Sequence, residues 1–299
     1  MTSRGLRGTT LAGVLLVATA TLIAPPAGAA PPPALDQGTT ADRGAPDGNV
    51  GARADGGTTA DRGAPERDVG ARALERRGRP GARIVLHGPS HARGAYVAKV
   101  LRETVMRERP AAGRRLWTAR TATGRSGGAT RLLVLAARRD RRGRPWVLVD
   151  APIRPNTLTG WIAARDARVG HTGWYLSVST GRRELRAYHD GALRRRARLV
   201  VGTPSTPSPH GLFAVYEITR QANPYGFVGP YAMHLTALSN VLASFGGGPG
   251  RVALHGRGSA ALGDPLGSAA SHGCLRADNH VIEWLRHRAG PGTPIRIGP

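Results

Sequence analysis

The chain of 299 residues contains a single cysteine, Cys274, and this scarcity limits what the protein can do. One cysteine cannot form an internal disulfide, and it cannot supply a pair of thiolate ligands to zinc. The histidines do not cluster at the spacings of a metal site either. We therefore expect no metal and no other cofactor, and the cysteine needs an explanation of its own.

Lysine is almost absent as well, because Lys99 is the only one among 43 basic residues. The formal net charge is +24, and such a basic surface indicates an anionic partner. No helix-turn-helix, zinc-finger or RNA-binding motif accompanies the charge, so a nucleic-acid partner is not expected. An anionic extracellular polymer fits the charge equally well, and a merely solvated basic surface is the plain alternative.

Long apolar runs are missing after the first thirty residues, so the mature protein is expected to have no membrane span. Residues 1–29 have the pattern of a signal peptide. Arg4 and Arg7 form a positive region, 11–23 are mostly apolar, and Ala27-Gly28-Ala29 is a cleavage site. We therefore expect an exported protein that acts outside the cytoplasm, at the cell wall.

Export bears on Cys274, because a free thiol in an oxidising compartment is a liability unless its reactivity is useful. A buried, inert cysteine is the usual alternative. Here the neighbours of Cys274 are glycine, serine and histidine rather than apolar residues. This composition favours a reactive cysteine over a structural one.

Residues 30–82 are predicted to be a disordered linker, because they are rich in Pro, Gly, Ala, Asp and Arg and poor in large apolar residues. The linker contains a duplication, in which residues 39–54 recur as 58–73 with few changes. Two copies without a hydrophobic face cannot stack into a repeat structure. We expect a flexible tether with no site.

Residues 83–169 are predicted to form a small β domain. A strand at 131–138, turn residues at 140–143 and a return strand at 146–149 make a hairpin, and 159–162 begin another strand. The order resembles bacterial SH3-like domains of wall-associated proteins. The resemblance implies binding of substrate or wall, and a plain spacer domain is the alternative that stays open.

Residues 170–299 are predicted to form the second domain, an antiparallel β-sandwich or barrel with a short C-terminal helix. Closely spaced strands separated by Gly and Pro are typical of this mainly β class. The helix should begin at Asp278 or Asn279 and end before Gly290-Pro291. The expected strands are 174–179, 184–189, 199–201, 211–216, 231–235 and 294–297, with a tight turn at Asp190-Gly191.

The chemistry is expected in the stretch from His255 to Cys274, which ends in Ser271-His272-Gly273-Cys274. A cysteine attacks as its thiolate, so it needs a base within hydrogen-bond reach, and histidine is the usual one. Two candidates exist, His272 close by in sequence and His255 at the end of a strand-like run. The backbone amides of Gly273 and Cys274 are expected to be free to bind an oxyanion.

These residues resemble the signature of the YkuD-type L,D-transpeptidases. In that pattern a histidine precedes a [Ser/Thr]-His-Gly-Cys segment by a loop of this length, as His255 precedes residues 271–276 here. Residues 176–201, 206–213 and 292–297 resemble other segments of the same domain, so the similarity extends over about 125 residues. The resemblance implies that Cys274 is the acylated nucleophile and His255 the base.

The resemblance also implies supporting roles for the neighbours. Ser271, His272 and Gly273 would shape the oxyanion side. Gly256 follows His255 where many members carry serine, so only a contact of its backbone carbonyl would survive. Arg276 and Tyr231 are assigned to substrate binding, and for Arg276 an ion pair with a local acid such as Asp278 is the alternative.

The implied reaction is acyl transfer on peptidoglycan stem peptides, with a Cys274 thioester, release of D-alanine and formation of a 3–3 cross-link by a monomeric enzyme. Water as acceptor would make the protein an L,D-carboxypeptidase instead. A non-catalytic wall-binding protein is the third possibility. Papain-like and sortase arrangements are disfavoured, because no distant histidine follows Cys274 and a sortase would leave His255 unexplained.

Overall fold

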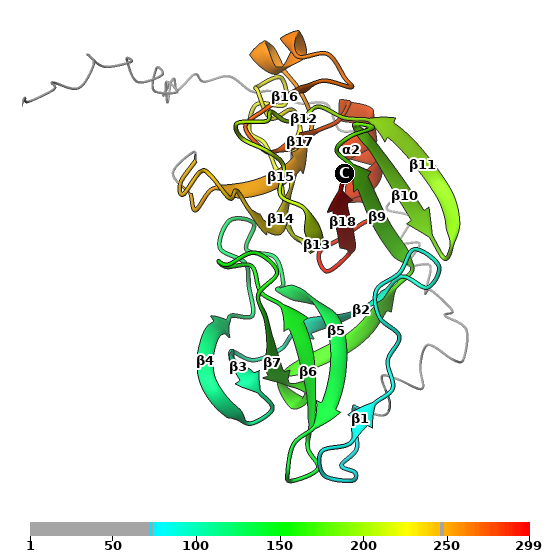
Figure 1. Ribbon diagram of the computed structural model, residues 1–299, viewed down its shortest axis with the longest axis vertical. Coiled ribbons are helices and arrows are strands. Elements are labelled where there is room, and N and C mark those ends of the chain that lie inside the picture. Colours follow the sequence, from blue (N-terminus) through cyan, green and yellow to red (C-terminus); the bar gives the residue numbers. More distant parts are fainter. Residues whose placement is uncertain (1–71, 73, 246–247) are drawn as a thin grey trace, which may run out of the picture. The chain divides into compact units, whose positions relative to one another are not determined.

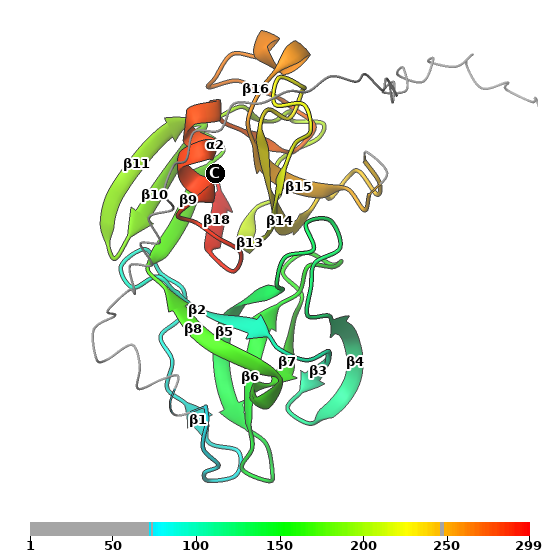
Figure 2. The same ribbon diagram turned by 180° about the vertical axis from the view of Figure 1, so that it is seen from behind.

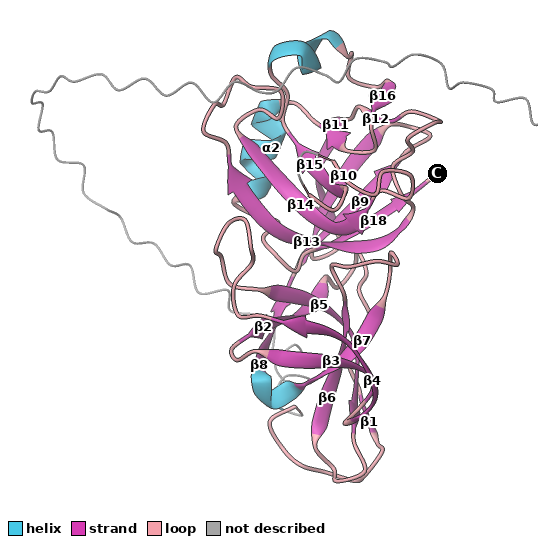
Figure 3. Cartoon of the chain, turned by 90° about the vertical axis from the view of Figure 1, so that its left-hand side faces the viewer, coloured by secondary structure: helices cyan, strands magenta, loops and turns pink. Residues whose placement is uncertain are grey.

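The computed structural model describes residues 72, 74–245 and 248–299. The predicted signal peptide, 1–29, and most of the predicted linker, 30–82, lie outside the described residues. Two large β-sheets and one α-helix dominate the described chain (Figure 3). In that part of the chain, no helix combines the length and the hydropathy that crossing a membrane requires.

The first sheet uses residues 83–172 and has the strand order β4-β3-β7-β6-β5-β2-β8, with β1 beside β5 (Figure 1). All of its described pairs are antiparallel. Its elements are β1 (Arg83–Ile84), β2 (Ala95–Val100), β3 (Thr104–Arg109), β4 (Ala112–Ala119), β5 (Arg131–Arg139), β6 (Pro145–Asp150), β7 (Thr159–Ala163), η1 (Ala164–Asp166) and β8 (Ala167–Thr172).

Alternation of side chains explains how this sheet buries one face. In β2, Tyr96, Ala98 and Val100 point into the core while Lys99 is exposed. The predicted hairpin of β5 and β6 forms, and Asp140 closes its turn by accepting hydrogen bonds from the amides of Arg142 and Arg144. These contacts outweigh burial and lower the pKa of Asp140 to about 2.

Two boundaries differ from the sequence expectation. Leu74, which falls in the predicted linker, is buried in the core of the first sheet, and the Gly78 and Gly81 amides donate to carbonyls of the β5–β6 turn. Strand β8 pairs with β2 as far as Thr172, so the first sheet continues three residues past the expected boundary at 169. The resemblance of this domain to SH3-like domains stays a prediction.

The second sheet has the order β11-β10-β9-β18-β13-β14-β15-β17, and a short pair of β12 and β16 lies outside it. Most pairs are antiparallel, but β9–β18, β15–β17 and β12–β16 are parallel. The elements are β9 (Trp174–Ser179), β10 (Glu184–His189), β11 (Ala192–Arg198), β12 (Val201–Gly202), β13 (Gly211–Arg220), β14 (Tyr231–Leu238), β15 (Arg251–His255), η2 (Ser259–Gly263), β16 (Ala269–Ser271), β17 (Leu275–Arg276), α2 (Asn279–Arg286) and β18 (Pro294–Gly298).

The predicted mainly β class, with antiparallel sheets and one short C-terminal helix, is confirmed. Strands β9 and β10 have the predicted bounds, and the turn at Asp190-Gly191 joins β10 to β11. Helix α2 begins at the predicted cap, where the Asp278 side chain accepts from the amide of His280. It ends at Arg286, before the predicted stop at Gly290.

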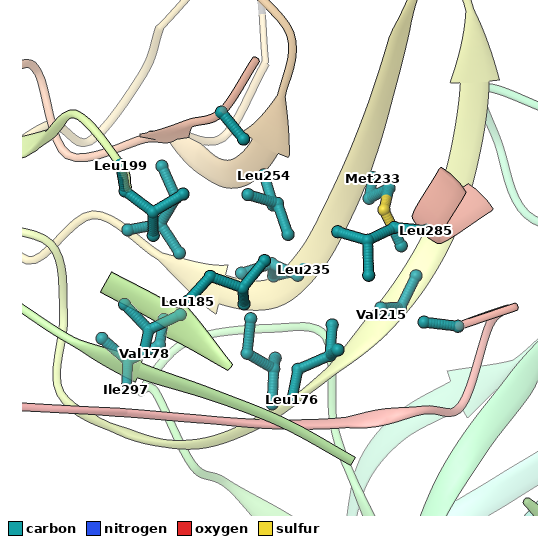
Figure 4. Packing of buried hydrophobic residues seen from close by; sticks show 14 of the residues in the cluster. Leu176, Val178, Leu185, Leu199, Val215, Met233, Leu235, Leu254, Leu285 and Ile297 are labelled. Carbon is teal, nitrogen blue, oxygen red and sulfur yellow. The ribbon is translucent and has the colours of Figure 1, made fainter. Parts of the chain in front are cut away.

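The core of the second domain lies between the sheet and α2 (Figure 2). Leu254 of β15 and Leu285 of α2 contribute to one cluster with Met233 and Leu235 of β14 (Figure 4). Burying each of these leucines contributes roughly 1.5–3 kcal/mol. This cluster determines which face of β15 is buried in the core, and therefore which face is left for the side chains of a functional site.

Candidate functional site

The short parallel pair of β15 and β17 brings the two ends of the motif together. Leu254 lies opposite Leu275, and both are fully buried in the core. Because side chains alternate along a strand, His255 points to the other face of the pair, and continuing the alternation of β17 back by one residue puts Cys274 on that same side. The sheet register therefore places the imidazole and the thiol, 19 residues apart in sequence, on one face of two neighbouring strands.

His255 is held in one orientation at the end of β15. Its residue is 4% exposed, and Nδ1 lies 2.7 Å from the carbonyl oxygen of Gly256. This contact requires the proton on Nδ1, so Nε2 is left as an acceptor. Burial lowers the pKa of His255 to about 4, while the Gly256 and Val228 carbonyls oppose this effect and the Arg276 charge adds to it. The imidazole is a neutral base at neutral pH.

Cys274 follows the turn that leads into β17, and its residue is partly exposed. Burial of the thiol raises its pKa, against the opposing effects of a backbone hydrogen bond from Ala253 and the charge of Arg276. The resting pair is therefore a neutral thiol and a neutral imidazole. Among the described residues no direct hydrogen bond joins the two side chains, and such contacts are often long before substrate binds.

The turn 271–274 is fixed from inside by Ser271. The Ser271 hydroxyl donates to the carbonyl of Cys274 at 2.6 Å and accepts from the amide of Gly273 at 3.1 Å. Gly273 has φ +110°, a conformation that disfavours any residue with a Cβ. The Gly273 amide is thus occupied, contrary to the expectation that it is free for an oxyanion.

The turn is also fixed from outside by the segment before β13. Ser208 is buried, and its hydroxyl donates to the Gly273 carbonyl at 2.9 Å while accepting from the Gly202 amide at 3.0 Å. Thr206 donates to the carbonyl of Ser271 at 3.1 Å. The sequence resemblance had marked residues 206–213, but nothing in it indicated that Ser208 supports the nucleophile.

His272 points away from this network. It is exposed, and its ring stacks against Phe245 with the ring centroids 6.1 Å apart and the planes at 25°. No hydrogen bond in the described chain connects it to Cys274. Of the two candidate bases, His255 has the defined tautomer and the shared strand face, and His272 has neither.

Gly256 cannot be replaced by serine without a rearrangement here. A Cβ at this position would lie 2.2 Å from Oδ1 of Asn279. That amide side chain holds the next residue, because Oδ1 accepts from the Arg257 amide at 2.7 Å and Nδ2 donates to the Arg257 carbonyl at 2.9 Å. Asn279 thereby fixes the loop whose Gly256 carbonyl orients His255. Sequence reasoning considered Asn279 only as a helix cap.

Arg276 lies directly opposite His255 and is 3% exposed. It pairs with Asp264, not with Asp278, and its guanidinium carbon lies 4.6 Å from the centre of the Phe227 ring. The Arg276 Nε atom has no hydrogen-bond partner in the described chain. A substrate carboxylate would have to share this arginine with Asp264.

The Tyr231 side chain faces away from His255, although its carbonyl accepts a hydrogen bond from the Gly256 amide at 3.3 Å. Ala232 is the residue opposite His255, so strand alternation turns Tyr231 to the core face of β14. There its ring lies 4.1 Å from the guanidinium carbon of Arg286 in α2. The strand pattern in the sequence predicts β14 but not its register with β15, and that register decides the face on which Tyr231 lies.

The described second domain is mainly β, and it holds a buried neutral histidine near the sole cysteine of the chain, which are the two side-chain types that cysteine acyl transfer requires. In the described residues no group of three His, Cys, Asp or Glu side chains could hold a metal ion. Residues 173–297 match the family model of the L,D-transpeptidase catalytic domain, YkuD.

Solved structures of such enzymes resemble the chain distantly. An L,D-transpeptidase from Mycobacterium tuberculosis H37Rv is 14% identical, covering 51% of this chain and 90% of its own, with a TM-score of 0.37. The catalytic domain of the E. faecium L,D-transpeptidase acylated by ertapenem is 25% identical, covering 43% of this chain and 99% of its own, with a TM-score of 0.31. No curated protein matches the chain.

Proposed function

We propose that this protein is an exported L,D-transpeptidase that acts on peptidoglycan stem peptides through a thioester on Cys274. The observation that carries the proposal is the shared strand face of His255 and Cys274, with the His255 tautomer fixed by Gly256. The family of residues 173–297 supports the substrate class. Export rests on the signal-peptide pattern of residues 1–29.

In the first half-reaction the Cys274 sulfur attacks the carbonyl carbon of the third stem residue, and the thiol proton moves to Nε2 of His255. The tetrahedral intermediate then collapses. The bond to the terminal D-alanine breaks, and His255 returns the proton to the leaving amine. The amide of Cys274 is our candidate for stabilising the oxyanion, because the Gly273 amide already donates to Ser271.

In the second half-reaction an amine from a neighbouring stem attacks the thioester. His255 accepts the proton of this amine and returns it to the sulfur as the thiol leaves. The product is a 3–3 cross-link and free Cys274. Water in place of the amine would give a shortened stem, which is the L,D-carboxypeptidase alternative.

The proposal is tested by the intact mass of the full chain after incubation with a carbapenem, and separately with a tetrapeptide-stem muropeptide. We expect one covalent adduct on Cys274, release of D-alanine, and a cross-linked dimer. The Cys274→Ala variant is the control and should give none of these. A wild-type protein with a reduced thiol, folded by circular dichroism, that gives neither adduct nor D-alanine would contradict the proposal.

Binding of an anionic wall polymer is a second candidate function, compatible with the first. One observation favours it. Lys99 of β2 lies directly opposite Arg131 of β5 on one side and Arg168 of β8 on the other, so three cations share one row across the sheet. They line a hollow of about 250 Å³. Like charges placed opposite each other are destabilising, and a bound anion would offset that cost.

A further inference from the structure

The loop between β14 and β15 has little core of its own to hold it. Its described residues are 239–245 and 248–250, and Val241 and Phe245 are more than half exposed. Ser239 closes the base, since its amide donates to the Gly250 carbonyl at 2.8 Å and its hydroxyl accepts from the Leu242 amide at 3.0 Å. Local hydrogen bonds of this kind stabilise a loop only weakly.

Arg154, in the segment between β6 and β7, ties the two arms of this loop together. Its guanidinium donates to the Ser239 carbonyl at 2.7 Å, to the Leu242 carbonyl at 2.9 Å and to the Pro249 carbonyl at 3.1 Å. These carbonyls come from both sides of the loop. A planar guanidinium can hold three acceptors in fixed directions, which a lysine ammonium does less well.

Asn156, two residues further on, fixes the end of β14 where the loop begins. Its Oδ1 accepts from the Leu238 amide at 2.8 Å, and its Nδ2 donates to the Leu238 carbonyl at 2.6 Å and to Oδ1 of Asn240 at 2.8 Å. The side chain thus pairs with Leu238 as a neighbouring strand would. Arg251, at the far end of the loop, donates back to the Pro152 carbonyl at 2.8 Å.

The same loop reaches the nucleophile turn. Phe245 stacks on His272, which stands two residues before Cys274. The chain of contacts therefore runs from Arg154 and Asn156, through the backbone of the loop, to an aromatic pair whose His272 stands two residues before Cys274 in sequence. All of these residues lie within the one unit formed by Ala60–Pro299.

We propose that Arg154 and Asn156 of the first β domain are positioning residues for acyl transfer at Cys274, acting by holding Phe245 against His272 as one wall of the substrate site. This inference rests on the proposed function. It assigns the first domain a direct part in shaping the site of the second. The wall contacts the stem peptide rather than the reacting carbonyl, so its loss raises KM for the muropeptide more than it lowers kcat.

The test uses the full chain with Arg154→Gln, Asn156→Ala, Phe245→Ala and the double variant Arg154→Gln/Phe245→Ala. Arg141→Gln is the matched control, because Arg141 is an exposed arginine of the same domain in the β5–β6 turn. The readouts are the rate of Cys274 acylation by a carbapenem, kcat and KM for D-alanine release, and hydrogen exchange of the amides in 239–245.

We expect Arg154→Gln and Asn156→Ala to slow acylation on the order of 10-fold and to speed exchange in 239–245, with Arg141→Gln unchanged. The double variant should be no slower than Phe245→Ala alone, because both changes remove the same wall. Melting temperatures show which variants are folded, and hydrogen exchange reports on the loop even where activity is too low to measure.

Three results would overturn the inference while leaving the proposed function intact. In the first, Arg154→Gln keeps the wild-type acylation rate and KM although hydrogen exchange in the loop is faster. In the second, hydrogen exchange in the loop is unchanged in Arg154→Gln. Fully additive losses in the double variant would also overturn it, since Arg154 would then act independently of Phe245. A wild-type chain that is not acylated at all would instead remove the proposed function on which the inference depends.

Discussion

At the scale of single residues, the site depends on two protonation states set by burial. The pKa of His255 is lowered to about 4, so the imidazole stays neutral far below the usual histidine range. The thiol of Cys274 has a raised pKa, so the pair does not exist as a preformed thiolate and imidazolium. In the proposed reaction the proton moves to His255 as the sulfur attacks, so His255 must be unprotonated to receive it.

This gives a prediction for the pH profile. The acid limb of kcat/KM for carbapenem acylation should lie near pH 4 rather than near 6.5, because kcat/KM reports the pKa of the free enzyme's base. Stopped-flow acylation from pH 3.5 to 8 measures it. His255→Ala should lose nearly all activity, and His272→Ala should keep the wild-type acid limb. An acid limb near 6.5 that disappears in His272→Ala would make His272 the base.

The same shift affects stability with a definite sign. A histidine whose pKa is lower in the folded state binds fewer protons there. Protonation therefore stabilises the unfolded state relative to the folded state as pH falls from about 6.5 to about 4. Urea unfolding at several pH values should show this loss in the wild type. The loss should be smaller in His255→Gln, which has no proton to bind at that position. An identical pH dependence in the two proteins would contradict the shift.

Gly256 gives a third prediction at this scale. Gly256→Ser places a Cβ about where Oδ1 of Asn279 lies, so either the amide or the loop must move. Overpacking of this kind costs about 1–3 kcal/mol, and here it also disturbs the carbonyl that orients His255. We expect a lower midpoint of urea unfolding and slower acylation.

The control for Gly256→Ser is Gly290→Ser, since a Cβ at Gly290 meets no atom within 4 Å. The double variant Gly256→Ser/Asn279→Ala should recover part of the lost stability, because removing the amide removes the clash. A Gly256→Ser protein as stable and as active as the wild type would show that the Asn279 side chain does not restrict this position.

At the scale of elements, the sequence pattern predicted those features that interactions between residues close in sequence determine. Period-two alternation located β9 and β10, and the Asp278 cap located the start of α2. The three parallel pairs were not predicted, because each joins segments distant in sequence and the register between them is set by the shared core. For the same reason the sequence pattern does not specify the face of β14 on which Tyr231 lies.

Supporting residues were missed for a related cause. The contacts of Ser208, Asn279, Arg154 and Phe245 involve backbone groups or rings, and such contacts carry no sequence pattern. Hydrogen bonds from a side chain to a distant main-chain carbonyl can be made by many residue types. Only the folded chain shows which carbonyl lies within reach.

The contact between Asp150 of β6 and Thr236 of β14 gives a prediction at the scale of elements. Asp150 is 2% exposed and accepts a hydrogen bond from the Thr236 hydroxyl. Burial raises the pKa of Asp150 to about 7, and the contacts with Thr236, Ala151 and Arg251 only partly oppose it. The contribution of Asp150 to stability is therefore complete below the unfolded-state pKa of about 4, and it is lost as pH rises through the folded-state pKa of about 7.

Asp150→Asn keeps the size of the side chain but cannot ionise. Relative to this variant, the wild type should lose stability by roughly 1.4 kcal/mol per pH unit between about pH 4 and 7. Urea midpoints at pH 5, 6, 7 and 8 measure the difference, and Glu103→Gln, which removes an exposed carboxylate, is the control. A difference that does not change with pH would mean that Asp150 is already ionised at pH 5.

At the scale of the whole molecule, charge is the dominant property. The excess of arginine over acid gives +24, and composition alone predicted an anionic partner. Composition could not say where such a partner binds, because exposed arginines occur on both sheets. The row formed by Arg131, Lys99 and Arg168 is distinguished by register rather than by number of charges, since its three cations lie side by side across adjacent strands.

This row gives the last prediction. Lys99→Gln/Arg131→Gln should weaken binding of a poly(glycerol phosphate) chain more than Arg120→Gln/Arg141→Gln, although both variants remove two charges from exposed or half-exposed positions of the same domain. Titration calorimetry at 50, 150 and 300 mM salt measures both. Because exposed charges are screened beyond about 8 Å at physiological salt, the general attraction should fade for all proteins while the difference between the variants persists. Equal losses at every salt concentration would mean that the polymer responds to net charge alone, and the three-cation row would then be an ordinary part of a basic surface.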